Sequence, residues 1–538
     1  MSRSLTAPAL ALLAGCTGTI FEPPPVQTPP VTPTVELPTT AIPRQSRREL
    51  EAQLFDVFGL SGAATRNLPP DAPMAVNPTT LAEEEVFDTL ADAKEPSEVF
   101  VEGLEGLALE LGRAMKANPA KVRAISGCTP SGTAVDEACL AAFVDALAPR
   151  LWRRAISVQE RDALVQAITP IANTARADAH GFAVQAVVMA LVSSPELAYR
   201  TELGTPVEAG VVRLTDGELV ARLAAFLWGA APTPELLARA SSGALDDAAV
   251  ATLVDEMLAD PRAREQQRVF HQLWLRYEGL LVTDTALATD MLAETSALVD
   301  RSLATAGTPW TTLFTSTQTY VTPRLAAHYG LSVPPSASWV DTAAPRAGVL
   351  SHGSFLSLSL TKGSDTLPSR RGAMLGRRVL CQQVLPPPKD VNIDNGVEVP
   401  AGACKTDAYA AHRSRGTCAG CHVVMDGLGF GFERLDGLGR YRETELDRPE
   451  CRIEGAGTFR GTAFSGPREL VGAQLLAITS CGVTQLARFA FRDRRVTPEL
   501  VQRLQDAFTA SSFDFQQLMR ALALDPRFRV RVAEGGSP

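Results

Sequence analysis

The chain has 538 residues, a length that accommodates three or four domains with ordinary hydrophobic cores. Hydrophobic residues make up 45% of it and charged residues 21%, which is typical of globular proteins. The net charge of −9 is modest and no basic stripe runs along the chain, so we expect no nucleic-acid partner. Aromatic residues are only 6% while Ala and Leu are abundant, which favours packed helices.

The first residues have the pattern of an export signal. Arg3 precedes an apolar run at residues 5–12, which is too short to span a bilayer, and Leu-Ala-Gly-Cys follows at 13–16. This ending resembles a bacterial lipobox, which implies cleavage before Cys16 and acylation of its thiol. Thr17 then indicates an outer-membrane lipoprotein of the cell envelope, with the lipid anchor making the membrane a partner. The alternative is a wrongly chosen start codon.

A proline-rich segment from Pro23 to Pro43 follows the signal. Such a composition predicts an extended polyproline-II tether that cannot build a core, so we expect order to begin near Gln45. Farther on, the longest apolar stretch, Gly181 to Val192, is too short to span a membrane and predicts a buried helix.

Signals for helix starts recur after the tether. Two capping boxes place a hydroxyl residue three positions before a glutamate, at Ser157–Glu160 and Thr215–Glu218. Proline directly after a hydroxyl residue predicts further starts at Ser194, Thr233 and Thr497. Strand-like alternation is scarce. The sequence therefore predicts a mainly α protein made of successive helical bundles.

The most informative motif is Cys418-Ala-Gly-Cys421-His422. C-x-x-C-H is the attachment signature of c-type haem, in which the two thiols add across the haem vinyl groups and the imidazole ligates the iron. The 9 Cys and 6 His of the chain give about 0.002 matches by chance. The motif predicts one covalently attached haem c, bound by Cys418 and Cys421, with His422 as the proximal iron ligand.

Zinc binding and redox chemistry are the two alternative uses of a C-x-x-C motif. A zinc site would require a second Cys/His pair at comparable spacing, and the sequence has none. A thioredoxin-like redox pair should open a helix after a strand in a βαβ unit, and no such pattern surrounds the motif. Haem attachment remains the interpretation that fits best.

The other cysteines agree with an exported protein. When Cys16 is assigned to lipid and the two motif cysteines to haem, six remain, an even number that suggests up to three disulfides in an oxidising compartment. Six cysteines allow fifteen connectivities, and some could simply be buried thiols. Cys128 and Cys139 are the nearest pair, so we expect that bridge. One arrangement of the rest is Cys381–Cys481 with Cys404–Cys451.

A glycine-rich segment follows the motif. Asp-Gly-Leu-Gly occurs at residues 426–429 and again at 436–439. With Gly431 these elements supply five glycines. Glycines let a backbone turn tightly and approach a flat ligand closely, so we expect a loop that wraps the haem rather than a surface loop. The side chains expected to cover the porphyrin are Leu428, Phe430, Phe432 and Leu438.

Together these segments resemble a known family. The motif with residues 425–430 and 436–442 is similar to the cytochrome-like domain of large exported proteins found in planctomycetes and myxobacteria. Segments at 143–154 with 193–200, at 214–228 with 257–275, and at 464–490 resemble its accompanying domains in the same order. The resemblance covers roughly residues 138–535. Most members are domains of unknown function, so it implies architecture and haem rather than an activity.

The expected organisation combines these observations. The haem domain is expected to be loop-rich, between helical domains. The predicted divisions are a signal peptide (1–16), a Pro-rich linker (17–45), helical regions at 46–135, 136–203 and 204–340, a cytochrome c-like haem domain (341–455) and a C-terminal helical domain (456–538).

The sixth iron ligand decides what the haem can do. His412 is the favoured candidate because it lies six residues before Cys418 and matches a histidine of the family pattern; residues 413–417 would then loop around the porphyrin edge. An exposed helix-surface histidine is the alternative. The weaker candidates are His328, His352 and Met374. Met425 is expected to stay on the side of His422, and Arg440 and Arg442 to pair with haem propionates or remain solvated.

Two classes of function remain open. In the first, the protein is an outer-membrane lipoprotein that uses its haem for extracytoplasmic electron transfer or haem-dependent redox chemistry, with an unknown redox partner. In the second, it is a binding or structural lipoprotein whose haem is regulatory or stabilising. No hydrolase triad, metalloprotease motif or phosphate loop occurs in the sequence.

Overall fold

The fold is described from a computed structural model of the chain. It describes residues 43–59, 65–71, 74–76, 83–85, 87–91, 97–175, 177–208, 210–243, 245–303, 308–360, 365–382, 399–414 and 416–532. The side chains of residues 74–76, 83–85, 411–412, 416–418 and 532 are not described. Cys16 and most of the Pro-rich tether therefore lie outside the described residues.

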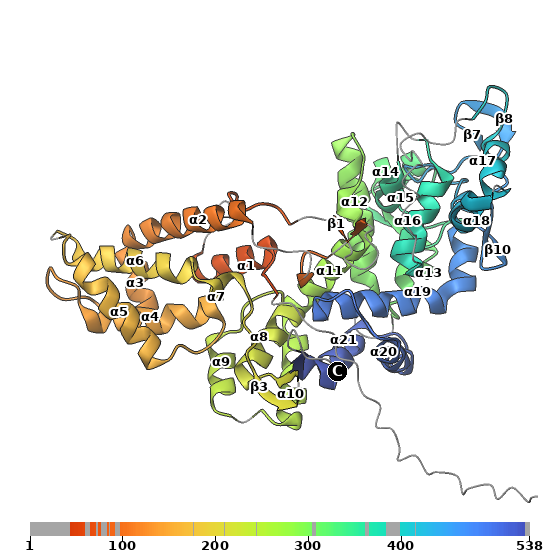
Figure 1. The fold of residues 1–538 in the computed structure, drawn as a ribbon. Coiled ribbons are helices and arrows are strands. Elements are labelled where there is room, and N and C mark those ends of the chain that lie inside the picture. Colours follow the sequence, from red (N-terminus) through yellow and green to blue (C-terminus); the bar gives the residue numbers. More distant parts are fainter. Residues whose placement is uncertain are drawn as a thin grey trace, which may run out of the picture. The chain divides into compact units, whose positions relative to one another are not determined.

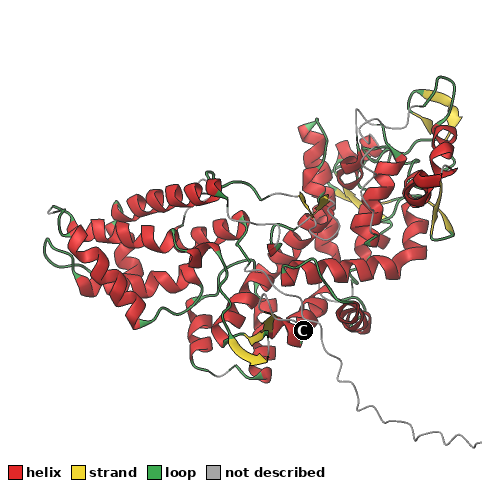
Figure 2. Cartoon of the chain, in the orientation of Figure 1, coloured by secondary structure: helices red, strands yellow, loops and turns green. Residues whose placement is uncertain are grey.

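The protein is mainly α, as the sequence predicts (Figures 1 and 2). Seven helices belong to the N-terminal part: α1 (Arg47–Phe58), α2 (Glu98–Lys116), α3 (Pro119–Ser126), α4 (Glu137–Trp152), α5 (Val158–Ala172), α6 (Ala179–Val192) and α7 (Pro195–Ala198). Their apolar faces form one hydrophobic cluster, which contains the predicted buried stretch as α6. The capping box at Ser157–Glu160 is confirmed at the start of α5.

Fourteen further helices follow in the described residues. They are α8 (Asp216–Leu227), α9 (Pro234–Ser241), α10 (Asp247–Ala259), α11 (Pro261–Leu275), α12 (Thr285–Ser302), α13 (Thr312–Thr315), α14 (Pro323–Tyr329), α15 (Gly353–Leu356), α16 (Pro368–Leu380), α17 (Lys405–Ser414), α18 (Gly416–Phe430), α19 (Gly466–Phe491), α20 (Pro498–Ala510) and α21 (Phe515–Ala523). The predicted starts at Thr215, Thr233 and Thr497 are confirmed as N-caps, because each side chain accepts a backbone N–H of the first turn.

The strands of the described residues are short, with two to five residues each. They are β1 (Met74–Val76), β2 (Glu83–Glu85), β3 (Thr205–Glu208), β4 (Val211–Arg213), β5 (Gln318–Val321), β6 (Ser338–Asp341), β7 (Thr444–Glu445), β8 (Arg448–Arg452), β9 (Ala456–Phe459), β10 (Thr462–Ser465) and β11 (Val530–Val532). Four two-stranded antiparallel pairs form, together with one three-stranded sheet in the order β11-β4-β3.

A second hydrophobic cluster contains residues of the helices from α8 to α21 other than α14 and α17. At its centre Trp274 and Trp310 stack with ring centroids 5.8 Å apart, and Phe515 stacks on Trp310 at 6.0 Å. The cluster takes residues from each of the predicted regions 204–340, 341–455 and 456–538. Helices α16 and α18, which carry the motif region, are thus packed on a shared core rather than standing apart from it.

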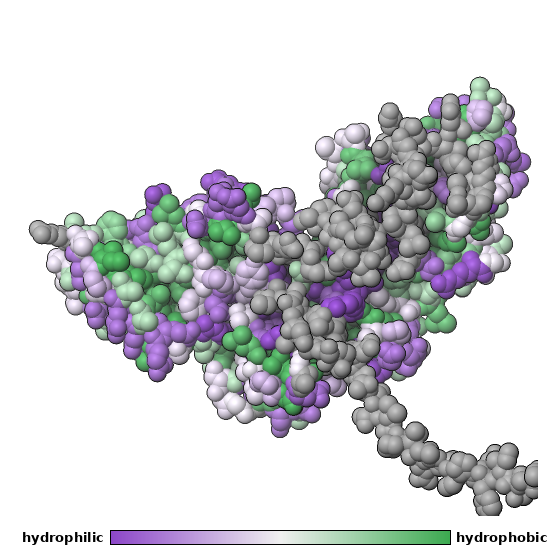
Figure 3. Space-filling model, viewed as in Figure 1, coloured by the Kyte–Doolittle hydropathy of each residue, from purple (hydrophilic) through white to green (hydrophobic). Residues whose placement is uncertain are grey.

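Among the described residues, α19 is the one helix that is long and apolar enough to cross a membrane. Half of its most apolar window is buried inside the protein, where it packs against α13, α16 and α20. It is also kinked at Gln474. These features are those of a core helix. On the face seen in Figure 3, hydrophilic and hydrophobic residues are intermixed.

Candidate haem-attachment site

The C-x-x-C-H motif lies within α18. In a helix, residues three and four apart share a face, so positions 418, 421 and 422 belong to one face of α18. The Cys421 side chain is an exposed free thiol, and that of His422 is 24% exposed. The side chain of Cys418 lies outside the described part of the chain. Met425, three residues after His422, lies on the same face as expected and is half-buried.

The His422 ring is held from one side by a buried carboxylate. Asp426, one helical turn further on, is fully buried, and its Oδ1 lies 3.1 Å from His422 Nδ1. Ser369, in the first turn of α16, donates its Oγ–H to the same Asp426 oxygen at 2.5 Å, and its Oγ lies 3.3 Å from His422 Nδ1. A carboxylate only accepts hydrogen bonds, so Nδ1 carries the proton in this contact.

Asp426 belongs to the segment that resembles the family, but the sequence alone predicts no role for it, and none for Ser369. Asp426 could have been found, because the spacing of four residues on a helix places it beside His422. Ser369 lies 53 residues before His422, and only the packing of α16 on α18 brings the two together. No local pattern in the sequence signals that contact.

The glycine-rich segment is helical, so the prediction of a haem-wrapping loop is wrong for residues 425–430. Its glycines serve close helix packing instead. A Cβ added at Gly429 would lie 1.9 Å from the Pro368 carbonyl oxygen, and one at Gly372 would lie 1.7 Å from that of Met425. Glycine thus allows the backbones of α16 and α18 to approach each other. Turns follow directly after α18, at residues 431–434, and again at residues 437–439, where Gly439 has a φ of +80°.

The apolar side chains expected to cover a porphyrin are packed inside the protein. Leu428 and Phe432 are completely buried, Phe430 is nearly so, and Leu438 packs against a small cluster around Met291. The prediction for these four residues is therefore corrected: Leu428, Phe430 and Phe432 are buried within the protein, and Leu438 is half-buried at the edge of that small cluster. Val424, three residues after Cys421 and therefore beside it on the helix surface, is 37% exposed. An exposed apolar side chain next to the motif suits a flat hydrophobic ligand. Val423 is 51% exposed but belongs to another face of α18.

His412 lies in the last turn of α17, and its side chain is outside the described part of the chain. Helix α17 packs against α18, so the structure brings the two helices together. Only residue 415 separates them. The expected loop over residues 413–417 is therefore not found, because helix occupies both ends of this segment.

The weaker candidates for a sixth ligand are engaged elsewhere. His352 is buried, with Nδ1 2.8 Å from Thr295 Oγ1 and Nε2 3.3 Å from Thr319 Oγ1. Burial lowers the pKa of His352 to about 3, so the ring is neutral. His328 contacts the Leu438 carbonyl oxygen at 3.0 Å, and Met374 is buried in the main core. The described hydrogen bonds of the two histidines, and the core packing of Met374, therefore involve other parts of the protein.

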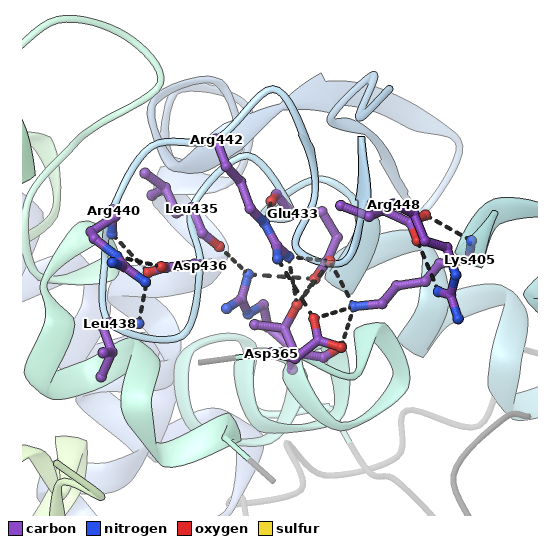
Figure 4. A network of polar contacts seen from close by, with 12 residues as sticks. Asp365, Lys405, Glu433, Leu435, Asp436, Leu438, Arg440, Arg442 and Arg448 are labelled. Carbon is purple, nitrogen blue, oxygen red and sulfur yellow. Dashed lines mark hydrogen bonds and ion pairs between the residues drawn. The ribbon is translucent and has the colours of Figure 1, made fainter. Parts of the chain in front are cut away.

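A buried ionic network fixes the segment that follows α18 (Figure 4). Glu433 accepts hydrogen bonds from Thr366 Oγ1 at 2.7 Å and from Arg442 Nη2 at 2.7 Å. Lys405 at the start of α17 and Arg371 of α16 approach the same carboxylate at 3.8 and 3.5 Å. The network therefore ties α16 and α17 to the segment after α18.

This network also corrects the expectation for the two arginines. Arg440 Nε donates to Asp436 Oδ2 at 2.8 Å, and Arg442 pairs with Glu433. Both carboxylates are buried and need a positive partner in the protein. Arg440 and Arg442 therefore form ion pairs within the protein, instead of the predicted pairs with haem propionates.

Three disulfides involve the six remaining cysteines. They are Cys128–Cys139, Cys381–Cys481 and Cys404–Cys451, with Cα atoms 5.3 to 5.5 Å apart. These are the pairs named in the sequence argument. Two of them flank the motif region: Cys381–Cys481 joins the end of α16 to α19, and Cys404–Cys451 joins the start of α17 to β8.

The protein is thus mainly helical, with the C-x-x-C-H motif on a helix whose neighbouring segments are joined by two disulfides. Two family models match the chain: PSD4, a protein of unknown function (DUF1592), over residues 214–331, and PSCyt3, a protein of unknown function (DUF1588), over residues 346–445. Both are domains of planctomycete cytochrome-like proteins, in agreement with the resemblance. The second match contains the motif, Ser369 and Asp426. No curated protein and no solved structure matches the chain.

The donor set fits a covalent haem. A thiol and an imidazole on one helical face, an exposed apolar neighbour and a carboxylate behind the imidazole are what such a group needs from the protein. A zinc site is less suited, because among the described residues the motif has no second pair of thiols beside it. The three-residue group Cys404, Glu445 and Cys451 contains a disulfide instead.

Proposed function

We propose that the chain is an exported c-type haem protein that acts in extracytoplasmic electron transfer or haem-dependent redox chemistry. Cys418 and Cys421 hold one haem through thioether bonds, formed when each thiol adds its sulfur and hydrogen across a vinyl C=C bond. His422 ligates the iron. The observation that carries this proposal is a C-x-x-C-H helix whose histidine has Nδ1 held by a buried carboxylate.

A bound haem supplies an iron centre that exchanges one electron or, with an open position, binds a small molecule. The chain's own residues do the rest. Asp426 and Ser369 orient the His422 ring. The close contact with α16 holds α18, the helix that carries His422, in position.

The compartment is part of the proposal. Three disulfides suit an oxidising environment outside the cytoplasm, where c-type haem is attached. A lipid on Cys16 anchors the protein to the outer membrane, and the Pro-rich tether separates the folded part from the lipid surface. The membrane is thus the proposed partner, alongside a redox partner of unknown identity.

His412 is the proposed sixth ligand. It lies on the helix that packs against α18, ten residues before His422. With two histidine ligands the iron has no vacancy, which favours electron transfer over chemistry on a substrate. Without His412 the iron is open to small molecules.

Optical spectra of the purified protein, oxidised, reduced and with carbon monoxide, test this function. We expect a low-spin haem that binds carbon monoxide poorly. Replacing His412→Ala should give a high-spin ferric spectrum and open the iron to carbon monoxide. His180→Ala, a change on the distant helix α6, serves as the control and should leave the spectrum unchanged. Absence of any haem band would overturn the proposal. An unchanged spectrum in His412→Ala would refute His412 as the sixth ligand but leave the proposed haem attachment standing.

A further inference from the structure

The contacts of Asp426 differ from those of the other carboxylates near the motif. Glu433 and Asp436 are buried but face arginine or lysine side chains. Asp426 is fully buried, and its Oδ1 contacts Ser369 and His422. Its second oxygen, Oδ2, is buried and has no hydrogen-bond partner among the described residues. The charge of Asp426 is therefore directed at the imidazole more than at a structural ion pair.

A hydrogen bond to a ligand's second nitrogen changes the ligand. A neutral imidazole that carries its proton on Nδ1 has its lone pair on Nε2, the atom that can bind a metal. A carboxylate that accepts the Nδ1 proton fixes this tautomer, orients the ring and makes the ligand more basic. A more basic ligand stabilises the ferric ion over the ferrous ion, because the ferric ion has the higher charge.

We propose that Asp426, supported by Ser369, is a positioning residue that fixes the Nδ1–H tautomer of His422 and lowers the reduction potential of the haem. This inference rests on the proposed function. It adds to the proposal a regulation of the site: a poise toward the oxidised form, set by a carboxylate behind the proximal histidine. Such a haem gives up its electron readily and therefore suits a partner that accepts electrons.

The surroundings agree with a strong local field. Tyr409 of α17 is buried, with its ring edge-on to Phe430 at a centroid distance of 5.4 Å. Burial raises the pKa of Tyr409 above its usual value, and the negative charge of Asp426 raises it further. The charge of Asp426 thus acts on a second buried side chain, Tyr409 of α17, as well as on His422.

A purely structural role for Asp426 would be to join α18 to α16 through Ser369. Loss of that bond would change stability but not the tautomer of a histidine or a reduction potential. The tests therefore measure these two quantities.

The first test needs no haem. In the double variant Cys418→Ser/Cys421→Ser, nitrogen NMR of labelled His422 should report a dominant Nδ1–H tautomer at neutral pH. Adding Asp426→Leu, which is close in size and accepts no hydrogen bond, should remove that preference. An Nε2–H tautomer in the double variant, or an unchanged tautomer after Asp426→Leu, would overturn the inference whether or not haem ever attaches.

The second test uses the haem-loaded protein. Asp426→Asn keeps the size and a hydrogen-bond acceptor but removes the charge, so the midpoint potential should shift upward. Asp407→Asn, on the exposed side of the neighbouring helix α17, removes the same charge without touching His422 and should produce a much smaller shift. Equal shifts in the two variants would overturn the role of Asp426. Failure of the parent to carry haem would overturn the proposed function, while the NMR result would still decide the inference.

Discussion

A buried acid, Glu294 of α12, illustrates how single residues set the behaviour of this protein. Thr319 Oγ1 donates to one carboxyl oxygen at 2.5 Å and Tyr329 Oη to the other at 2.8 Å, while His352 Nε2 lies 3.6 Å away. Burial raises the pKa of Glu294 to about 7, and these two hydrogen bonds only partly oppose the shift. Glu294 is therefore protonated in the folded protein at pH values where the unfolded chain has lost its proton.

This shift predicts a dependence of stability on pH. Between the unfolded pKa of 4.5 and the folded pKa of about 7, only the folded state binds the proton, so stability falls as the pH rises through that window. Glu294→Gln removes this loss. The stability of the variant relative to the parent should rise by about 3 kcal/mol from pH 4.5 to pH 7.5.

Denaturant unfolding of both proteins at several pH values checks this prediction. The buried His352 stays neutral, so it lowers the stability of the folded state at acid pH. Because His352 is present in both proteins, its contribution cancels in the difference, which reports the effect of Glu294. A relative stability that does not change with pH would contradict the raised pKa.

At the scale of elements, the contact between α16 and α18 positions the site. It depends on glycines that permit backbone approach, and its geometry leaves no room for a methyl group at Gly429. Gly429→Ala should destabilise the protein by about 2 kcal/mol, because overpacking forces the helices apart. Gly420, on the same helix, has open space around its Cα.

The matched variant Gly420→Ala should therefore stabilise the protein by about 0.5 to 1 kcal/mol, as expected for alanine in a helix. Thermal or denaturant unfolding of the two variants measures both effects. If Gly429→Ala were as stable as Gly420→Ala, the close contact between the two helices would be refuted.

The elements also show how far local sequence reaches. Helix starts at Ser157, Thr215 and Thr497 follow from capping chemistry within a few residues, so they were predictable. The helix over residues 425–430 was not, because glycine disfavours helix locally and only the packing partner, α16, compensates. Ser369 could not be predicted either, because its contact with His422 also depends on the packing of α16 on α18.

At the scale of the whole molecule, the mainly α class follows from composition and helix signals, whereas the shared core does not. Residues from Leu214 to Phe528 pack in one cluster, and their pairing depends on long-range contacts that leave no periodic mark in the sequence. The motif, by contrast, is local. Spacing alone predicts haem attachment at Cys418, Cys421 and His422, whereas the contact of Ser369 with His422 depends on the folded structure.

The proposed lipid anchor concerns the whole molecule as well. Replacing Cys16→Ser removes the acylated thiol, so the protein should move from the membrane fraction to the soluble fraction. Cys421→Ser, which alters a cysteine of the motif but not the anchor, should remain with the membrane. Immunoblotting of the two fractions measures the outcome. Continued membrane association of Cys16→Ser would argue against lipidation and direct attention to α19, the apolar helix of the core.

The central claim is a haem bound covalently at Cys418 and Cys421, and acid–acetone extraction tests it most directly. The protein is matured in the periplasm and extracted beside the Cys418→Ser/Cys421→Ser variant. The account predicts that the haem stays with the parent polypeptide, with an intact mass larger by one haem, and that the variant retains none. Complete transfer of haem from the parent into acetone, or a parent mass without haem, would contradict the account.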